Sequence, residues 1–430
     1  MRTAEMRRVV ITGMGARTPL GSDVKETWQG LLEGRSGVGP ITIFDASSFP
    51  TKIAGEVKKC DFGKWHKKGA EFAQLGRNSL FALEATEEAV NDARLDSKKK
   101  DPRLGVYFGA GDAGFDFPVY AELMTRSMDE QSVDVKKYFS NSVQVLSARG
   151  LLEQEPFQVI NHLSSVFGAL GPTSNCLTAC AASSQAIGEA AEIIRRGDAD
   201  VMISGGSHSM IHPLGVAGFN LLTALSTRNE VPAKASRPFD KNRDGFVLSE
   251  GAGVVILEEL EHAKKRGATI YAELAGYGGT GDAFRMTDPH AEGRGAIKAM
   301  RLALGHANMK PSDIHYINAH GTSTELNDAI ETRSVKEVFG TDAKKIPMSS
   351  IKSMLGHMIA AAGAVEMIAS ILTIREGIIP ATINYETPDE VCDLDYVPNK
   401  ARKASVKTVL SNSFGFGGQN IALIIKEYKA

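Results

Sequence analysis

Cysteine, net charge and long apolar runs are all scarce in this chain of 430 residues. Its four cysteines include no CxxC pair and cannot form a disulfide framework, so we expect a reducing, cytoplasmic location. A net charge of −2 gives no electrostatic case for binding nucleic acid. The longest apolar region, around Met358 to Leu372, is interrupted by Glu366, which favours a buried helix over a membrane span. The N-terminal apolar stretch is too short to predict a signal peptide.

The pattern that is present alternates short β-branched runs with helical stretches. Most of the runs are apolar throughout, as in strands that are buried on both faces. The alternation predicts an α/β protein whose sheets are covered by helices, and the length predicts two core-sized units. The predicted strands are Arg8 to Ile11, Val106 to Phe108, Val201 to Ser204, Val254 to Leu257, His315 to Asn318 and Thr408 to Asn412, and a helix is predicted over Ser79 to Arg94.

Two helical stretches rich in small residues form a faint internal repeat. Ala181 to Arg196 ends at Gly197, and Met358 to Glu376 ends at Gly377. Helices built from Ala, Ser and Gly suit a position between closely packed layers, so we expect two similar halves, each with its central helix buried between sheets. The predicted domains are residues 1–265 and 266–430, with a join near Lys264 to Thr269.

The segment SNCLTACAASSQAIGEA places a cysteine directly before an alanine-rich helix. At a helix N-terminus the macrodipole favours an anion, so we expect a lowered thiol pKa and a nucleophilic thiolate at Cys180. Cys176 lies four residues earlier, before the helix, and lacks this placement. The structural alternative is that Cys180 is a small buried apolar residue.

Three further segments carry polar groups that suit chemistry. In INAHGTST, His320 follows a predicted strand and precedes Thr322 and Thr324, in the position where α/β proteins bind ligands. The alternative is a turn whose hydroxyls satisfy local backbone groups. The other segments are SSIKSMLGHMIAAAGAVE, which places Lys352, His357 and Glu366 in an apolar setting, and NSFGFGGQN, whose Gly415, Gly417 and Gly418 surround Phe416. Buried charges need partners or a purpose, and dense glycines let a backbone approach a ligand.

Taken in order, TACAAS, NAHGTST, KSMLGH, AAAGAVE and NSFGFGG resemble the type II β-ketoacyl-[acyl-carrier-protein] synthases. The resemblance covers nearly the whole chain except residues 115–165, where an insertion is expected. It implies a thiolase-like, five-layered αβαβα sandwich of two related halves that forms a homodimer. It also implies decarboxylative Claisen condensation of an acyl thioester with malonyl-acyl-carrier-protein in fatty-acid elongation, without a metal or cofactor.

The resemblance also implies a role for each matching residue. Cys180 is the nucleophile, His320 and His357 are the paired histidines, and Lys352 and Glu366 support them. Phe416, with Gly415 and Gly417, forms the oxyanion and gating loop; Thr322 and Thr324 hold the phosphopantetheine arm; Asp112 and Phe219 line the acyl pocket; Lys64, Lys67 and Lys68 dock the acidic carrier protein. Without the resemblance, those lysines are also explained as an ordinary solvated face.

Competing classes fit the sequence less well. A thiolase would need a second cysteine in the segment that here reads NSFGFGGQN, and a type III synthase would have Asn where His357 stands. A non-catalytic partner of the chain-length-factor kind would lack Cys180. A specialised ketosynthase for a polyketide-like or unusual acyl chain remains the alternative, because Asp112, Arg285 and Gln419 depart from the family pattern. Asp112 either caps a turn, shortens the acyl pocket or faces a functionalised chain.

Overall fold

Ten strands form the mixed β-sheet that organises the chain. The computed structural model describes residues 7–69, 72–110 and 116–429. The strands of the sheet are β1 (Val9–Arg17), β4 (Leu104–Ala110), β7 (Thr173–Cys176), β8 (Val201–His208), β9 (Gly251–Glu259), β10 (Ala272–Gly281), β11 (Tyr316–Asn318), β12 (Met348–Ser349), β15 (Thr408–Gly415) and β16 (Gln419–Lys426). Short two-stranded ribbons pair β2 (Val38–Pro40) with β3 (Ile53–Gly55) and β13 (Ile378–Ile379) with β14 (Arg402–Lys403).

The sheet consists of two five-stranded halves with the same topology. In the order β1-β9-β8-β4-β7, the first two pairings are antiparallel and the next two are parallel. The order β10-β16-β15-β11-β12 repeats this sequence of pairings. Within the sheet, the halves are joined by the pairing of Val10 and Ile11 of β1 with Glu273 and Ala272 of β10. The prediction of two similar halves is therefore confirmed, while the domain division at residue 265, between α10 (Leu260–Lys265) and β10, stays a prediction.

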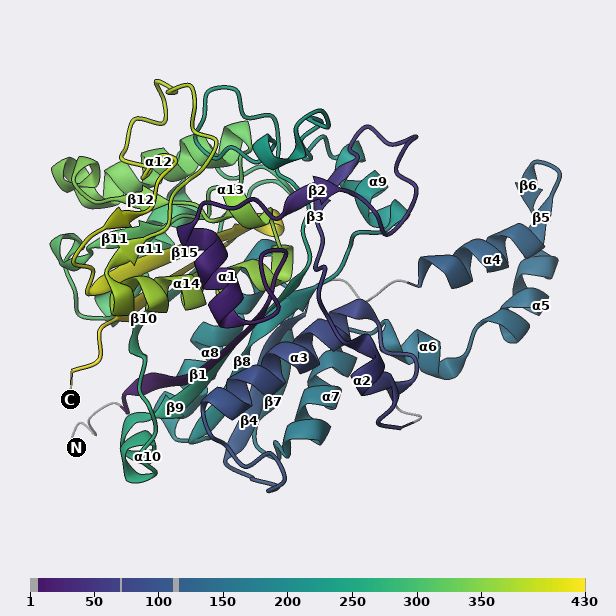
Figure 1. Cartoon of the computed structure of the whole chain (residues 1–430), viewed down its shortest axis with the longest axis horizontal. Helices are drawn as coiled ribbons and strands as arrows, with labels where there is room; N and C mark the ends of the chain where they lie inside the picture. The colour runs from purple at the N-terminus through teal and green to yellow at the C-terminus, as the bar shows by residue number, and fades with distance from the viewer. Residues whose placement is uncertain (1–6, 70–71, 111–115, 430) are drawn as a thin grey trace.

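Helices complete a five-layered αβαβα arrangement (Figure 1), which confirms the predicted fold class. The central helices α8 (Ala182–Arg196) and α14 (Ala362–Glu376) contact strands of both halves and each other. On the outside, α3 (Arg77–Asp92) and α7 (Phe157–Phe167) cover the first half, while α11 (Arg294–His306) and α12 (Glu325–Phe339) cover the second. Separate apolar clusters fill the two outer interfaces and the central layer.

Small residues are required where the two central helices meet. A Cβ at Gly363 of α14 would lie 2.0 Å from Ser184 Oγ of α8. Each central helix ends at a glycine in the left-handed conformation, Gly197 (φ 86°) and Gly377 (φ 65°), where a side chain would be strained. The small-residue composition that predicted buried helices thus has a steric cause.

Both central helices begin later than predicted. A 3₁₀ turn precedes each of them, η2 (Ala179–Ala181) before α8 and η6 (Ile359–Ala361) before α14. Positive φ angles at Ala179 (47°) and Ile359 (41°) separate these turns from the preceding chain. Cys180 therefore lies in a 3₁₀ turn, two residues before α8 begins, and not at the α-helical N-terminus itself.

Residues 116–155 form an arm that projects from the body of the molecule (Figure 1). The arm contains α4 (Phe117–Ser127), the hairpin of β5 (Met128–Asp129) and β6 (Ser132–Val133), α5 (Val135–Val145) and α6 (Ala148–Glu153). The remaining α-helices of the described residues are α1 (Val24–Leu32), α2 (Phe62–His66), α9 (Pro213–Leu221) and α13 (Lys352–Leu355). Among the described helices, none combines the length and apolar character that crossing a bilayer requires.

Candidate active site

Cys180 lies in the turn η2 with its side chain buried at the centre of the molecule. Burial raises the pKa of its thiol to about 11, and this effect exceeds the opposing influence of the Phe416 and Cys180 backbone amides and of the Lys352 ammonium group. The expected decrease in the thiol pKa is therefore wrong, because desolvation outweighs the local N–H groups. The same amides point at the sulfur, so a negative charge that develops there during reaction meets donors already in place.

His320 follows β11, and side chains from other elements hold both its backbone N–H and its backbone carbonyl. Its backbone N–H and that of Gly321 donate to the buried Glu331 carboxylate at 2.9 and 2.8 Å. The Lys352 ammonium donates to the His320 carbonyl at 2.7 Å and lies 3.4 Å from ring Nδ1. Burial, then Lys352 and then His357 hold the pKa of His320 well below its ordinary value. The ring is therefore neutral, with an ammonium donor at Nδ1 and its own proton on Nε2.

His357 is oriented by the turn that leads into α14. Its backbone N–H donates to the Val247 carbonyl at 2.7 Å, and its ring Nδ1 accepts the Ile359 N–H at 3.2 Å. Burial holds the pKa of His357 well below its ordinary value, with smaller contributions from Lys352 and His208. The neutral ring thus carries its proton on Nε2, which has no hydrogen-bond partner among the described residues.

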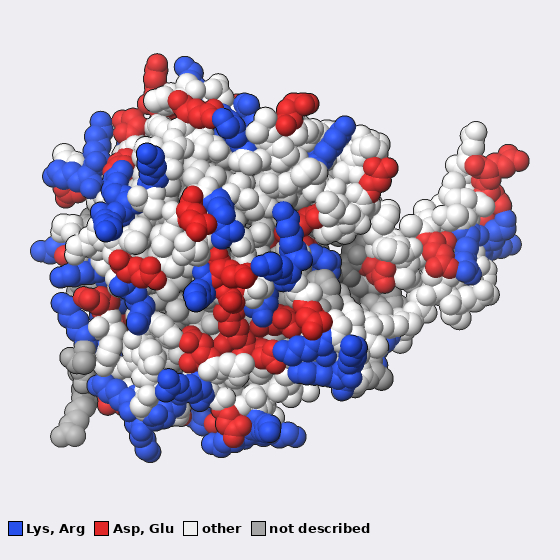
Figure 2. Space-filling view, in the orientation of Figure 1, with Lys and Arg blue, Asp and Glu red and all other residues white. Residues whose placement is uncertain are grey.

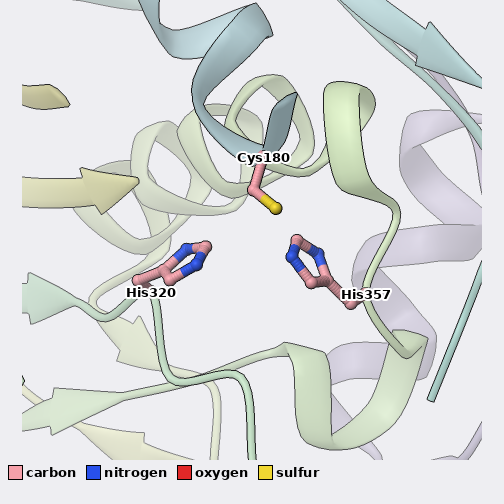
Figure 3. Close-up of side chains that lie close together, drawn as sticks. All are labelled: Cys180, His320 and His357. Carbon is pink, nitrogen blue, oxygen red and sulfur yellow. The ribbon is translucent and has the colours of Figure 1, made fainter. Parts of the chain in front are cut away.

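The three side chains converge from separate elements on one point (Figure 3). One ligand-type atom from each, the Cys180 sulfur and a ring nitrogen of each histidine, lies within 4.8 Å of the others. The two rings meet edge to face with centroids 5.4 Å apart. Such a set could in principle coordinate a soft metal ion, but it also forms a thiol facing two N–H donors, the arrangement that acyl chemistry requires.

Lys352 and Glu366 form a buried ion pair behind the histidines, which confirms that these charges have partners. Burial raises the pKa of Glu366, and the Lys352 ammonium opposes that change. Because both side chains are almost fully enclosed, removal of either leaves an uncompensated charge next to His320.

A cavity of about 440 Å³ opens onto Cys180 and both histidines. Thr322 and Thr324 line it, with their hydroxyl oxygens 2.9 Å apart, and Phe416 also lines it. The loop Gly415–Phe416–Gly417 is anchored by the Gly417 N–H, which donates to the Met286 carbonyl at 2.6 Å. Gly417 has φ 82°, a conformation that favours glycine.

Cys180 also belongs to an apolar cluster that includes Ile211, Phe246 and Leu248. Phe219 packs edge-on against Phe246 with ring centroids 5.4 Å apart, and Phe246 packs edge-on against His357 at 5.2 Å. Phe219 thus packs against the apolar cluster that contains Cys180, and its role in an acyl pocket stays a prediction. Asp112 lies outside the described residues.

The predicted basic surface lies on and after α2, where Figure 2 shows clustered Lys and Arg side chains. Lys64 forms an ion pair with Glu87, and the Lys68 ammonium lies 3.6 Å from the centroid of the Trp65 ring. Lys67 is exposed. Of the residues that depart from the family pattern, Arg285 is exposed and forms an ion pair with Asp288 at 2.9 Å, whereas Gln419 begins β16.

Sequence reasoning missed two acidic residues of α12 that hold the turn after β11. Glu331 of α12 accepts hydrogen bonds from the turn after β11 and from Asn412 Nδ2 at 3.1 Å, and burial raises its pKa to about 7. Asp328, one helical turn earlier, accepts the Phe239 N–H at 2.8 Å. The signal was the spacing of these acids, which puts both on the face of α12 that also buries Val335.

Comparisons with known proteins agree with this geometry. The models of the N-terminal and C-terminal domains of β-ketoacyl synthases match residues 6–263 and 271–386. The 3-oxoacyl-[acyl-carrier-protein] synthase 2 of Coxiella burnetii is 46% identical over 98% of this chain and 99% of its own length. The chain therefore belongs to the β-ketoacyl synthase family.

Solved structures give the same result for the fold. A β-ketoacyl synthase from Burkholderia phymatum superposes with a TM-score of 0.89 at 35% identity, covering 99% of this chain and all of the other. A ketosynthase described as bound to a hexaketide and in complex with its type II polyketide acyl-carrier protein gives 0.87 at 36% identity, with the same coverage. The resemblance to the β-ketoacyl synthases that the sequence motifs indicated is therefore confirmed.

Proposed function

We propose that this chain is a β-ketoacyl-[acyl-carrier-protein] synthase that elongates fatty-acyl chains. It condenses an acyl group held as a thioester on Cys180 with malonyl-acyl-carrier-protein, and it releases CO₂ and a β-ketoacyl carrier. The observation that carries the proposal is the convergence of a buried thiol with two neutral histidines inside one cavity. Similarity along the full length to a 3-oxoacyl-[acyl-carrier-protein] synthase supports it.

In the first half-reaction, the Cys180 sulfur attacks the carbonyl carbon of the incoming acyl thioester. The carbonyl oxygen becomes an oxyanion, which the Cys180 and Phe416 amides stabilise, each by about 10²–10³ in rate. When the intermediate collapses, the carbon–sulfur bond to the carrier breaks. The departing carrier thiolate takes up the proton that Cys180 lost, so the exchange is balanced.

In the second half-reaction, malonyl carrier binds and its carboxylate leaves as CO₂. The bonding electrons become an enolate, whose oxygen lies between the two Nε2–H donors of His320 and His357. Neutral imidazoles suit this role because they stabilise the oxygen without protonating the carbanion. The enolate carbon then attacks the Cys180 thioester, and the carbon–sulfur bond breaks to regenerate the thiol after protonation.

Other residues position these groups. Lys352, held by Glu366, fixes the His320 backbone and presents a donor to ring Nδ1, so that Nε2 keeps its proton. Thr322 and Thr324 lie in the cavity wall, where their hydroxyls suit the amide groups of a phosphopantetheine arm. Phe416 and its flanking glycines form the loop that covers the sulfur.

Product analysis tests this proposal directly. Purified protein incubated with an acyl carrier should gain the mass of the acyl group on the peptide that contains Cys180. Addition of malonyl carrier should discharge that mass and yield a β-ketoacyl carrier two carbons longer. The absence of acyl mass at Cys180 with every acyl carrier tested would exclude the proposal.

We further propose that the partners are acyl- and malonyl-loaded carrier proteins and a second copy of the chain, in the cytoplasm. The solved ketosynthase described in complex with its acyl-carrier protein supports the first. For a homodimer, the support is that β7 forms an edge of the sheet and that α5 exposes Val135, Phe139 and Val143 at helical spacing on one stripe. Sedimentation should give twice the chain mass, and Phe139→Glu with Val143→Glu should shift it toward monomer.

A further inference from the structure

His208 is a buried histidine that the condensation mechanism does not use. It is the last residue of β8, its side chain has 0% exposure, and both ring nitrogens lack hydrogen-bond partners among the described residues. By contrast, the enclosed His162 is paired, since its Nε2 lies 2.9 Å from Glu153. Because an unpaired buried polar group destabilises the fold, an imidazole without partners indicates that a ligand is missing.

Strand alternation directs His208 toward the central layer. Met202 of β8 belongs to the central apolar cluster, and a Cβ at Gly206 would lie 2.7 Å from Ser183 Cβ and 2.5 Å from the Ala360 carbonyl. His208 is two residues beyond Gly206 on a strand without register shifts, so its side chain projects to the same side. It therefore faces the region of the turn η6, beside His357.

The same edge of the sheet carries Cys180. β4, β7 and β8 are parallel, so their carboxyl ends lie together, and Cys180 follows β7 at that edge. Directly after His208, Met210 and Ile211 join the apolar cluster that contains Cys180, Phe219 and Phe246. His208 thus lies two residues before the polypeptide joins the apolar cluster that contains Cys180.

The ring is a neutral donor and acceptor. Burial, and to a lesser degree His212, lower the pKa of His208 to about 3. His208 also contributes to the lowered pKa of His357, which agrees with the proximity of the two rings. Because one ring nitrogen donates and the other accepts, a carbonyl or hydroxyl oxygen would be a complementary ligand, whereas a methylene chain would leave both nitrogens unpaired.

We propose that His208 is a specificity-determining residue of the acyl pocket, which hydrogen-bonds an oxo or hydroxyl group on the acyl chain carried by Cys180. The inference rests on the proposed function and names its substrate class: acyl chains that bear oxygen along their length. Sites built to pair a substrate oxygen discriminate against the analogue that lacks it, because a buried group then stays unpaired.

Internal competition for Cys180 tests the proposal. Decanoyl carrier is mixed with oxo- or hydroxydecanoyl carriers in which the oxygen moves one carbon at a time, and acyl masses on the Cys180 peptide are compared. The wild type should favour the best-placed oxygenated chain by about tenfold, the value of one net hydrogen bond. His208→Leu should remove that preference, and His208→Gln, which keeps a donor and an acceptor, should restore part of it.

The ratio is measured within one sample, so a lower folded fraction in a variant cancels. His315→Leu, an exposed position before β11, is the matched control and should keep the wild-type ratio. A wild-type ratio near one at every oxygen position, or an unchanged ratio in His208→Leu, would overturn the inference. Acylation by decanoyl carrier alone still supports the proposed function in that case, whereas no acylation by any chain contradicts the proposed function itself.

Discussion

The turns η2 and η6 occupy equivalent places in the two halves of the molecule. Each begins with a residue of positive φ, Ala179 at 47° and Ile359 at 41°. Each leads into a central helix of 15 residues that ends at a left-handed glycine. The middle residue of the turn is Cys180 in the first half and Ala360 in the second.

The side chains of the active site, in contrast, are divided unequally between the halves. The first half supplies the thiol, whereas His320, His357, Lys352 and Glu366 all come from the second. Ala360 packs instead in a small apolar cluster with Cys176 and two alanines of α8. The duplicated backbone thus provides a frame, and a few side chains on it decide what each half does.

The strongest test of this comparison removes the thiol. Cys180→Ala should abolish condensation, because no acyl group can be held, while malonyl decarboxylation continues on the intact histidines and amide donors. Product mass analysis and CO₂ release measure the two activities. Moving the thiol to the equivalent turn, in Cys180→Ala with Ala360→Cys, should not restore condensation, because Ala360 packs against Cys176 and α8, whereas it is Cys180 that converges with the two histidines. Recovery of product in the double variant would show the turns to be functionally interchangeable.

The next largest effect is expected at the histidines. His320→Ala or His357→Ala should lower malonyl decarboxylation by about 10²–10⁴, because each removes an Nε2–H donor from the enolate oxygen. Acylation of Cys180 should stay measurable, since its oxyanion is held by the backbone amides. Rapid-quench acylation and CO₂ release separate the two steps. Wild-type decarboxylation in both variants would contradict the division of labour between the halves.

The frame was more predictable from sequence than the site's electrostatics. Small-residue helices and apolar strands have steric causes that composition reveals, as with Gly363 against Ser184. The 3₁₀ turns were missed because nothing in ACAAS or HMIAAA distinguishes a 3₁₀ start from an α-helical one. The thiol pKa was predicted in the wrong direction, because burial of Cys180 depends on distant segments that enclose it.

The supporting groups also depend on three-dimensional enclosure. Glu331 lies 11 residues after His320, on a different element, and His208 ends an ordinary strand. Their positions beside the site therefore emerge only when the sheet and α12 are assembled. Motif recognition found Lys352 and Glu366 because both lie in the same short stretch of sequence as His357. For Glu331 the local signal is only its spacing from Asp328 on α12, and His208 carries no such pattern.

Glu331 gives a pH-dependent test of how the second half holds His320. Its folded pKa of about 7 exceeds its ordinary value of 4.5, so between these values the folded state binds a proton that the unfolded state has lost. The free energy of unfolding should therefore fall as pH rises from about 4.5 to 7, by on the order of 3 kcal/mol from this group. Urea unfolding of wild type and Glu331→Gln across that range measures it. The variant should show a flatter pH dependence, and parallel curves would exclude this role.

The smallest effect is expected at the basic surface, which belongs to the first half alone. Lys67 and Lys68 are exposed beside α2, and reversing them as Lys67→Glu with Lys68→Glu should repel an acidic carrier protein. We expect KM for acyl carrier to rise several-fold, about 1 kcal/mol in all, and the rise should shrink at high salt because exposed charges are screened.

Lys64 is left unchanged because its ion pair with Glu87 ties it to α3. Lys98→Glu with Lys100→Glu makes the same charge change at a second exposed cluster and should leave KM unaltered. Activity on a small pantetheine thioester should be the same in all three proteins, since that substrate carries no carrier surface; an equal loss on both substrates would indicate damage to the fold instead of docking.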